Sequence, residues 1–310
     1  MAASFTQLIG SSIERRFPNV FANAGDATGL TIGALREAER GGTAVVIMCV
    51  DLTEQVLSEA ISLHANAIIA YAPMPREPLR ALRVDDPVGR VVLQCAQQNI
   101  ATFSLHTACA NAPGGAADWI ASSLARGTTR PIVAHTGCAE AGEGRLLECD
   151  EARSLSALIS RLKELLGVRH LRVALGAVVD EHHLAKASDS CFVKSIALQV
   201  RPPRPRANSE ALSRPPAPHT QVGEGACLLQ QVLQGAGPAF SGVFLTSEMA
   251  HVDVLAANAK GIIVLLAGQS MMERAFLRHL RQDMQEEFTD ADWNVKMKCS
   301  ETDCHTLTVV

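Results

Sequence analysis

The stretch Ala101-Thr-Phe-Ser-Leu-His106-Thr107-Ala-Cys109-Ala110-Asn-Ala-Pro-Gly-Gly115 begins as a short apolar run, ends that run in His-Thr, and then breaks at a Pro-Gly-Gly turn. The apolar run predicts a buried β-strand. Polar groups at the end of a buried strand lie where α/β sheets usually keep their binding sites. His106 is therefore the first candidate functional residue.

A second stretch has the same design: Gly261-Ile-Ile-Val-Leu-Leu-Ala267-Gly-Gln269-Ser-Met-Met-Glu273-Arg274. It predicts an apolar strand, a short turn and a helix with Glu273 in its first turn. Strand ends that carry a histidine and a carboxylate are suited to a metal site between parallel strands.

The rest of the chain alternates predicted strands with predicted helices, which favours βαβ units. Ala44–Val50 and Ala67–Tyr71 are strand-like apolar runs, and Asp86 followed by Pro87 is typical of a helix start. We therefore predict an α/β fold of two lobes, with mainly parallel sheets flanked by helices. The first lobe is expected to contain residues 1–125 with 261–310, and the second residues 126–260. Residues 201–222 are proline-rich and basic, and we expect a disordered insertion there that could dock on a protein partner.

Composition excludes several classes of function. The net charge is −4 and aromatic residues make up 4% of the chain, so direct nucleic-acid binding is not expected. No run approaches the roughly 18 apolar residues of a membrane span. Nine cysteines without a CxxC pair indicate reduced thiols. We expect a cytoplasmic protein, with Arg15-Arg16 leaving a mitochondrial transit peptide as the alternative.

Several motifs in series resemble the NGG-interacting factor 3 family, also known as GTP cyclohydrolase I type 2 homologues. They include Val50-Asp-Leu-Thr-Glu-Gln-Val, Asn99-Ile-Ala-Thr-Phe-Ser-Leu-His-Thr-Ala, Gly114-Gly-Ala-Ala-Asp-Trp-Ile-Ala, Gly142-Glu-Gly-Arg-Leu, Thr246-Ser-Glu-Met-Ala-His and Ser300-Glu-Thr-Asp. The resemblance runs from about residue 26 to the end and implies an NGG-interacting-factor-3-like fold, a homohexamer, and a cavity that holds two divalent metals.

The metal-ligand positions that the resemblance implies are substituted here. Ala72 replaces a histidine in Tyr71-Ala72-Pro73, Ala110 replaces an aspartate, and Gln269 replaces the histidine before Glu273. A divalent cation needs several anionic or imidazole ligands to offset its dehydration. The substitutions therefore predict loss of two-metal hydrolysis. A residual one-metal site formed by His106, Glu273 and His251 is the alternative.

Two functions follow from these residues. The first is a pseudoenzyme that keeps the fold and assembly, binds no cofactor, and acts as a scaffold or regulatory binding protein. The second is a divalent-metal-dependent hydrolase acting on a nucleotide, pterin-like or phosphoester substrate, with Glu273 as a ligand and His106 as a ligand or general base.

Other constellations point to structure rather than chemistry. Cys109 beside His106 lacks an orienting third group, and Cys299 with Cys304 lacks further zinc ligands. Gly142-Glu-Gly144 and Gly223-Glu-Gly225 are interpreted as turns, because neither belongs to a nucleotide-binding fingerprint. We expect His182-His183 to lie in an exposed loop.

Overall fold

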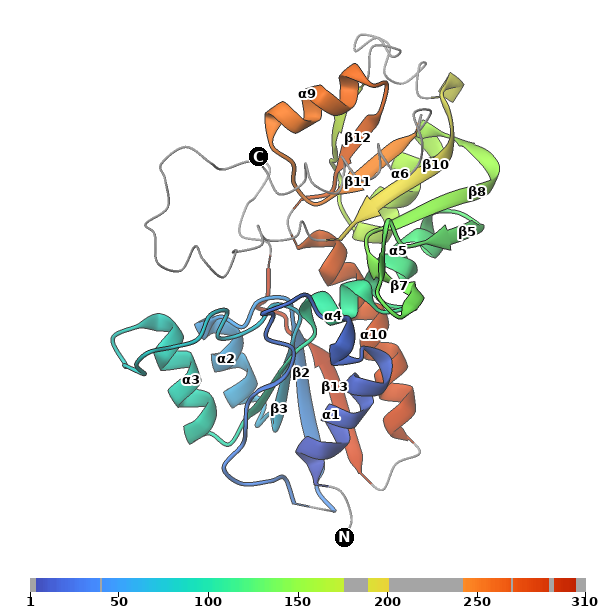
Figure 1. Cartoon of the computed structure of the whole chain (residues 1–310). Helices are drawn as coiled ribbons and strands as arrows, with labels where there is room; N and C mark the ends of the chain where they lie inside the picture. The colour runs from blue at the N-terminus through green and yellow to red at the C-terminus, as the bar shows by residue number, and fades with distance from the viewer. Residues whose placement is uncertain are drawn as a thin grey trace. The chain divides into compact units, whose positions relative to one another are not determined.

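The computed structural model describes residues 4–39, 41–175, 189–200, 242–268, 270–289 and 293–304, which form two compact units (Figure 1). Unit 1 contains Met1–Ala116 and Glu273–Val310, and unit 2 contains Ala117–Met272. The described part of the chain has no helix that is long and apolar enough to cross a membrane.

Unit 1 is built on a five-stranded sheet with the strand order β1-β4-β3-β2-β13. The strands are β1 (Gly29–Ile32), β2 (Thr43–Cys49), β3 (Ala67–Ala70), β4 (Ala101–Ser104) and β13 (Asn294–Cys299). β4, β3, β2 and β13 pair in parallel, and β1 lies antiparallel beside β4 at one edge. Every residue of β3 and β4 is buried, as expected for strands covered on both faces.

Helices cover both faces of this sheet. Figure 1 shows α2 and α3 on one side and α1 and α10 on the other. The helices of unit 1 are α1 (Phe5–Arg16), the 3₁₀-helix η1 (Asn19–Phe21), α2 (Glu54–Ser62), α3 (Pro87–Gln97), α4 (His106–Asn111) and α10 (Met271–Thr289), which joins the unit at Glu273. Thr53 and Asp86 cap α2 and α3 by accepting hydrogen bonds from Val56 N (3.3 Å) and Gly89 N (2.7 Å).

Unit 2 contains a six-stranded sheet with the order β5-β8-β10-β11-β12-β9. Its elements are α5 (Ala116–Leu124), β5 (Gly127–Arg130), the paired strands β6 (Val133–His135) and β7 (Cys138–Glu143), β8 (Arg145–Ser154), α6 (Leu155–Leu166), β9 (Arg172–Ala174), β10 (Phe192–Gln199), β11 (Val243–Thr246), α9 (His251–Ala259) and β12 (Ile263–Leu266). Only the pairs β10–β11 and β11–β12 are parallel, whereas β8 pairs antiparallel with both neighbours and β9 with β12.

The α/β class is confirmed, but of the two large sheets only that of unit 1 has the expected, mainly parallel character. The sheet of unit 2 is mixed because no helix separates β5 from β8, and strands joined without a crossover helix pair antiparallel. The units also divide the chain differently from the predicted lobes. β12 belongs to unit 2, since α9 carries the chain from β11 to a parallel partner beside it. The predicted insertion at 201–222, the pair His182-His183 and the Gly223-Glu-Gly225 turn lie outside the described residues.

The Gly142-Glu-Gly144 motif receives a structural explanation from Arg145. The side chain of Arg145 is fully buried and donates to the carbonyl oxygens of Gly142 (2.6 Å) and Gly144 (2.8 Å). It also forms a bidentate pair with Asp118 on α5, at 2.6 and 3.0 Å. A β-carbon at Gly142 would lie 2.0 Å from the carbonyl oxygen of Val133, so the close approach of β6 requires glycine there. The motif therefore holds β7, β8 and α5 together.

In unit 1, Glu59 attaches the chain after β13 to α2. Its carboxylate accepts hydrogen bonds from Ser300 Oγ (2.5 Å), Glu301 N (2.9 Å), Thr302 N (3.1 Å) and Thr302 Oγ1 (2.7 Å). Burial alone would raise the pKa of this carboxyl, but these bonds lower it from 4.5 to about 2.

We predict that Glu59→Gln lowers the free energy of unfolding by about 1–2 kcal/mol near pH 7, because an amide cannot accept all four bonds. The folded-state pKa is depressed, so this stabilisation is present above the unfolded pKa of 4.5 and is lost as the pH falls towards about 2. Urea unfolding of both proteins near pH 7 and near pH 3 should show a smaller difference at the lower pH. Glu301→Gln is the matched control, because that exposed side chain accepts none of these bonds. A difference that stays constant with pH would contradict the prediction.

Candidate functional site

The candidate site of unit 1 lies at the carboxyl ends of β3 and β4. Leu105 N donates to Ala70 O (3.0 Å) and His106 N donates to Tyr71 O (2.8 Å), so the parallel pairing continues one step beyond the strands. His106 then begins α4 with a φ of +30°, which is rare for a residue other than glycine. The two adjoining strand ends bring Tyr71-Ala72 next to His106. The sequence pattern suggests a metal site between the parallel strands that precede His106 and Glu273, but those strands, β4 and β12, belong to different sheets.

Asp26 orients the His106 ring. One carboxylate oxygen lies 2.6 Å from His106 Nδ1, and the other accepts the backbone N–H of Thr107 (3.1 Å) and the Thr107 hydroxyl. Both side chains of the Asp26–His106 pair are buried, with 9% and 7% of their surface exposed. Burial alone would raise the pKa of Asp26, but the bonds and charge of His106 and the bonds from Thr107 lower it.

The Asp26 pair determines which ring nitrogen of His106 remains available. An ionised Asp26 can only accept a hydrogen bond, so Nδ1 of His106 must carry the hydrogen that it donates. In the neutral imidazole, Nε2 then carries the lone pair. A histidine held by a carboxylate in this way is typical of metal ligands and of general bases. Asp26 was not among the predicted site residues. The sequence does show that Asp26 lies just before a short strand. However, only the antiparallel pairing of that strand, β1, with β4 brings Asp26 to His106.

A second layer of amides and hydroxyls supports the pair. Thr107 Oγ1 accepts a hydrogen bond from Asn23 N (2.9 Å), and Asn111 Nδ2 donates to Phe21 O and Asn23 Oδ1, both at 2.9 Å. These bonds attach α4 to the segment that leads into β1.

The neighbouring positions supply no metal ligand. Ala72 is buried two residues after the end of β3, and Ala110 lies four residues after His106 on α4, on the same helix face. Neither methyl group can coordinate a cation, and Gln269 lies outside the described residues. Among the residues that the structure describes, no group of three or more His, Cys, Asp or Glu side chains could hold a metal ion. The described donor set therefore does not fit a two-metal centre.

The predicted trio His106, Glu273 and His251 is distributed over both units. His106 and Glu273 belong to unit 1, whereas His251 is the exposed first residue of α9 in unit 2. Glu273 is fully buried in the first turn of α10, next to Arg274, which pairs with Asp303 at 2.6 Å. A one-metal site formed by these three residues stays a prediction.

The thiol chemistry considered for Cys109 is disfavoured. Cys109 is fully buried, and burial raises the pKa of its thiol, so the nucleophilic thiolate is suppressed. The cysteines in the described ranges are all free thiols.

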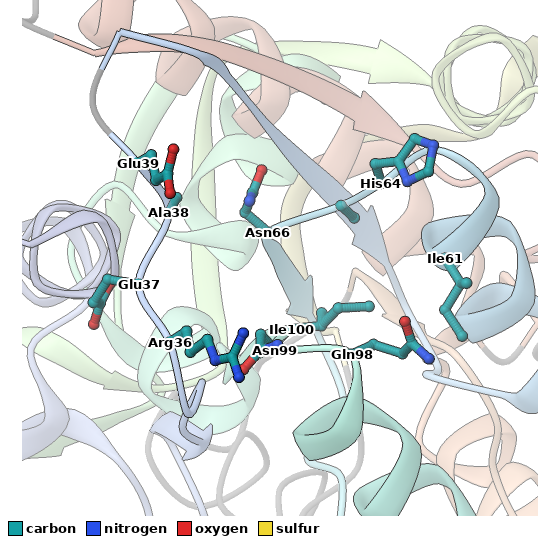
Figure 2. Close-up of a pocket in the computed structure, with 11 residues that line it drawn as sticks. Arg36, Glu37, Ala38, Glu39, Ile61, His64, Asn66, Gln98, Asn99 and Ile100 are labelled. Carbon is teal, nitrogen blue, oxygen red and sulfur yellow. The ribbon is translucent and has the colours of Figure 1, made fainter.

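A pocket of about 320 Å³ lies at the amino ends of β3 and β4, opposite to the strand ends that carry His106. In Figure 2 the extended segment Arg36–Glu39 borders it, with Asn66 and the residues that follow α2 and α3 completing the wall. Glu37 already accepts two hydrogen bonds from Thr6, from N (3.0 Å) and from Oγ1 (2.9 Å). Charges of both signs line this pocket, which gives no preference for a cation or an anion, and His106 is not among its residues.

Comparison with known proteins places the chain in a family. A family model described as Duf34/NIF3 (NGG1p interacting factor 3) matches residues 6–186 and 223–305. The chain is 29% identical over 283 residues to the protein NIF3 homolog of Schizosaccharomyces pombe, covering 89% of this chain and 87% of that protein. It is 25% identical over 310 residues to NGG1-interacting factor 3 of Saccharomyces cerevisiae, covering 96% and 94%.

Its fold is similar to the crystal structure of a Bacillus cereus protein related to NIF3, with a TM-score of 0.75, 18% sequence identity and full coverage of both chains. The matched residues include Asp26, the His106-Thr107 motif and Glu273. The chain therefore belongs to the DUF34/NIF3 family.

Proposed function

We propose that this protein is a metal-site-degenerate member of the NIF3 family that acts as a scaffold or regulatory binding protein. The observation that carries the proposal is the presence of Ala72 and Ala110 beside His106, where the family resemblance implies metal ligands. Of the carried-over positions that the structure describes, His106, Glu273 and His251 keep a side chain that can coordinate a cation, and His251 belongs to the other unit.

Electrostatics supports the loss of metal chemistry. Two divalent cations held close together repel each other, so their site needs several carboxylates or imidazoles. His106 commits Nδ1 to Asp26 and retains one nitrogen, and Glu273 adds one carboxylate. The free energy of dehydrating two cations far exceeds what this donor set returns.

A binding role requires partners, and two kinds are proposed. The first is a second copy of the chain, in the hexamer that the resemblance implies. The second is another protein: the name of the Saccharomyces cerevisiae relative describes that protein as an NGG1-interacting factor, which supports protein binding as the mode of action. The proline-rich residues 201–222 are one candidate for that contact.

We propose a cytoplasmic location. In α1, Arg15 and Arg16 both pair with Glu287 on α10, and Phe5, Ile9 and Ile13 are buried. These contacts give the basic pair a role in the folded domain, which supports the cytoplasmic proposal over the mitochondrial one.

The Asp26–His106 pair favours a second candidate function. A histidine oriented by a carboxylate is the arrangement used for general base catalysis, which supports a hydrolase with a rearranged site. In that case Glu273 would hold the cation, and His106 Nε2 would bind it or accept a proton.

Metal content separates the two functions. We predict that untagged protein, expressed with added zinc, manganese and iron, contains less than about 0.2 metal ions per chain by inductively coupled plasma mass spectrometry. The triple variant Ala72→His, Ala110→Asp, Gln269→His should gain metal, because it adds two imidazoles and a carboxylate to His106 and Glu273. The same variant with His106→Ala should lose most of the gain.

About one or more metal ions per chain in the wild-type protein would contradict the scaffold proposal and favour the hydrolase. Glu273→Ala and His106→Ala, assayed for metal content and for hydrolysis of nucleotides and phosphoesters, would then test the ligand assignment.

We also predict that Asp26 and His106 are coupled in stability. Asp26→Ala and His106→Ala should each lower the free energy of unfolding, and a double-mutant cycle by urea unfolding should give a coupling of about 1–2 kcal/mol. His64→Asn is the control, because His64 is an exposed histidine of the same unit with a positive φ of 52° that asparagine tolerates. A coupling near zero would mean that the pair does not hold α4 in place.

A further inference from the structure

A pocket of about 230 Å³ in unit 2 combines basic and apolar side chains. It lies between the end of α5 and the first turn of α6, near the junctions with β5 and β8. The lining residues are Ser122, Ser123, Leu124, Ala125, Arg126, Arg153, Ala157, Leu158 and Arg161.

Three arginines line this pocket, and no acidic residue does. All three side chains belong to exposed residues, and arginine remains protonated at any physiological pH. Within the described ranges, the guanidinium groups of Arg126 and Arg153 have no carboxylate partner. The protein as a whole has a net charge of −4, so this concentration of positive charge is local.

Arg161 is held in a defined orientation. Its Nε donates to the carbonyl oxygen of Ser123 (2.9 Å), and its Nη1 pairs with Glu164 Oε2 (2.9 Å). The bond to Ser123 links α6 to the end of α5 and keeps the guanidinium at the pocket.

The first turn of α6 adds to the positive potential. Ser154 caps this 12-residue helix by accepting a hydrogen bond from Ala157 N (3.3 Å), and Ala157 and Leu158 line the pocket. The positive end of a helix macrodipole favours a bound anion.

The other lining residues are two serines and four apolar residues: Ser122, Ser123, Leu124, Ala125, Ala157 and Leu158. Leu124, Ala125 and Leu158 are almost fully buried, with 4%, 5% and 2% of their surface exposed. A volume near 230 Å³ is below the range of about 300–1,000 Å³ that is usual for drug-sized ligands. The ligand should therefore be small, anionic at one end and apolar at the other.

We infer that this pocket binds a small phosphomonoester, with its phosphate on Arg126, Arg153 and Arg161 and its carbon body on Leu124 and Leu158. A phosphomonoester carries a charge of about −1.5 to −2 and three terminal oxygens, so three guanidinium groups favour it over a singly charged carboxylate. The site lies within unit 2 and involves none of the residues around His106, so it goes beyond the scaffold function and does not depend on it.

Isothermal titration calorimetry of the full chain at low ionic strength tests this inference with three probes: n-butyl phosphate, inorganic phosphate and sulfate. Butyl phosphate should bind saturably and at least about threefold more tightly than inorganic phosphate, because its alkyl chain covers the apolar surface. Affinity for both should fall as salt is added.

Arg126→Gln and Arg153→Gln should each weaken butyl phosphate binding by about fivefold or more, since each removes a charge-assisted bond. Both side chains are exposed, so neither change should disturb folding, which circular dichroism checks. Arg169→Gln is the matched control: this exposed arginine follows α6 and does not line the pocket.

Three results would overturn the inference. The first is an absence of saturable binding at butyl phosphate concentrations up to about 10 mM, since a specific small-ligand site would bind more tightly than that. The second is an effect of Arg126→Gln and Arg153→Gln no larger than that of Arg169→Gln. The third is sulfate binding as tight as that of butyl phosphate, which would mean an adventitious anion patch only.

Discussion

The hydrogen bond between Asp26 and His106 is the interaction on which the candidate site depends. It joins a carboxylate placed before the edge strand β1 to the residue that begins α4, and both partners are buried. A buried carboxylate without partners would be costly, so Asp26 also accepts both donors of Thr107. The result is a closed polar cluster that holds α4 against the segment around Asn23 and leaves one nitrogen of His106 available.

Few side chains near that nitrogen could bind a cation together with it. Ala72 and Ala110 place methyl groups where the family resemblance implies ligands, and Glu273 is a single buried carboxylate. The fold keeps the backbone geometry of the site, since the parallel pairing of β3 and β4 continues to Tyr71 and His106. The proposed scaffold function rests on this retained backbone geometry together with the two methyl groups beside His106.

The two units use charge differently. In unit 1 the ionisable groups near the site are bonded to partners, as in Asp26 with His106 and Arg274 with Asp303. Unit 2 buries Arg145 in a bidentate pair, yet around Leu158 it exposes three arginines with no acidic residue lining the same pocket. The ionisable groups near His106 in unit 1 therefore satisfy one another. The pocket in unit 2 that is lined by three arginines is the one with an electrostatic preference for anions.

Much of the local structure could be predicted from the sequence because its causes are local. Thr53, Asp86 and Ser154 cap helices where their side chains reach the next N–H groups, and apolar runs such as Ala67–Ile69 form buried strands. The short polar strands β5, β6 and β7 were missed, since exposed residues such as Thr128 show no hydrophobic period.

By itself, the sequence determined the α/β class, the family and the strand-end position of His106, because these follow from hydrophobic pattern and motif order. Only the tertiary structure decided that Asp26 meets His106, 80 residues apart, and that the sheet of unit 2 is mixed. It also brought Arg126, Arg153 and Arg161 into one pocket. The physical reason is that strand pairing and helix packing set such contacts, through hydrogen bonds and burial between residues far apart in the sequence. The residues next to each position in the sequence carry no information about those contacts.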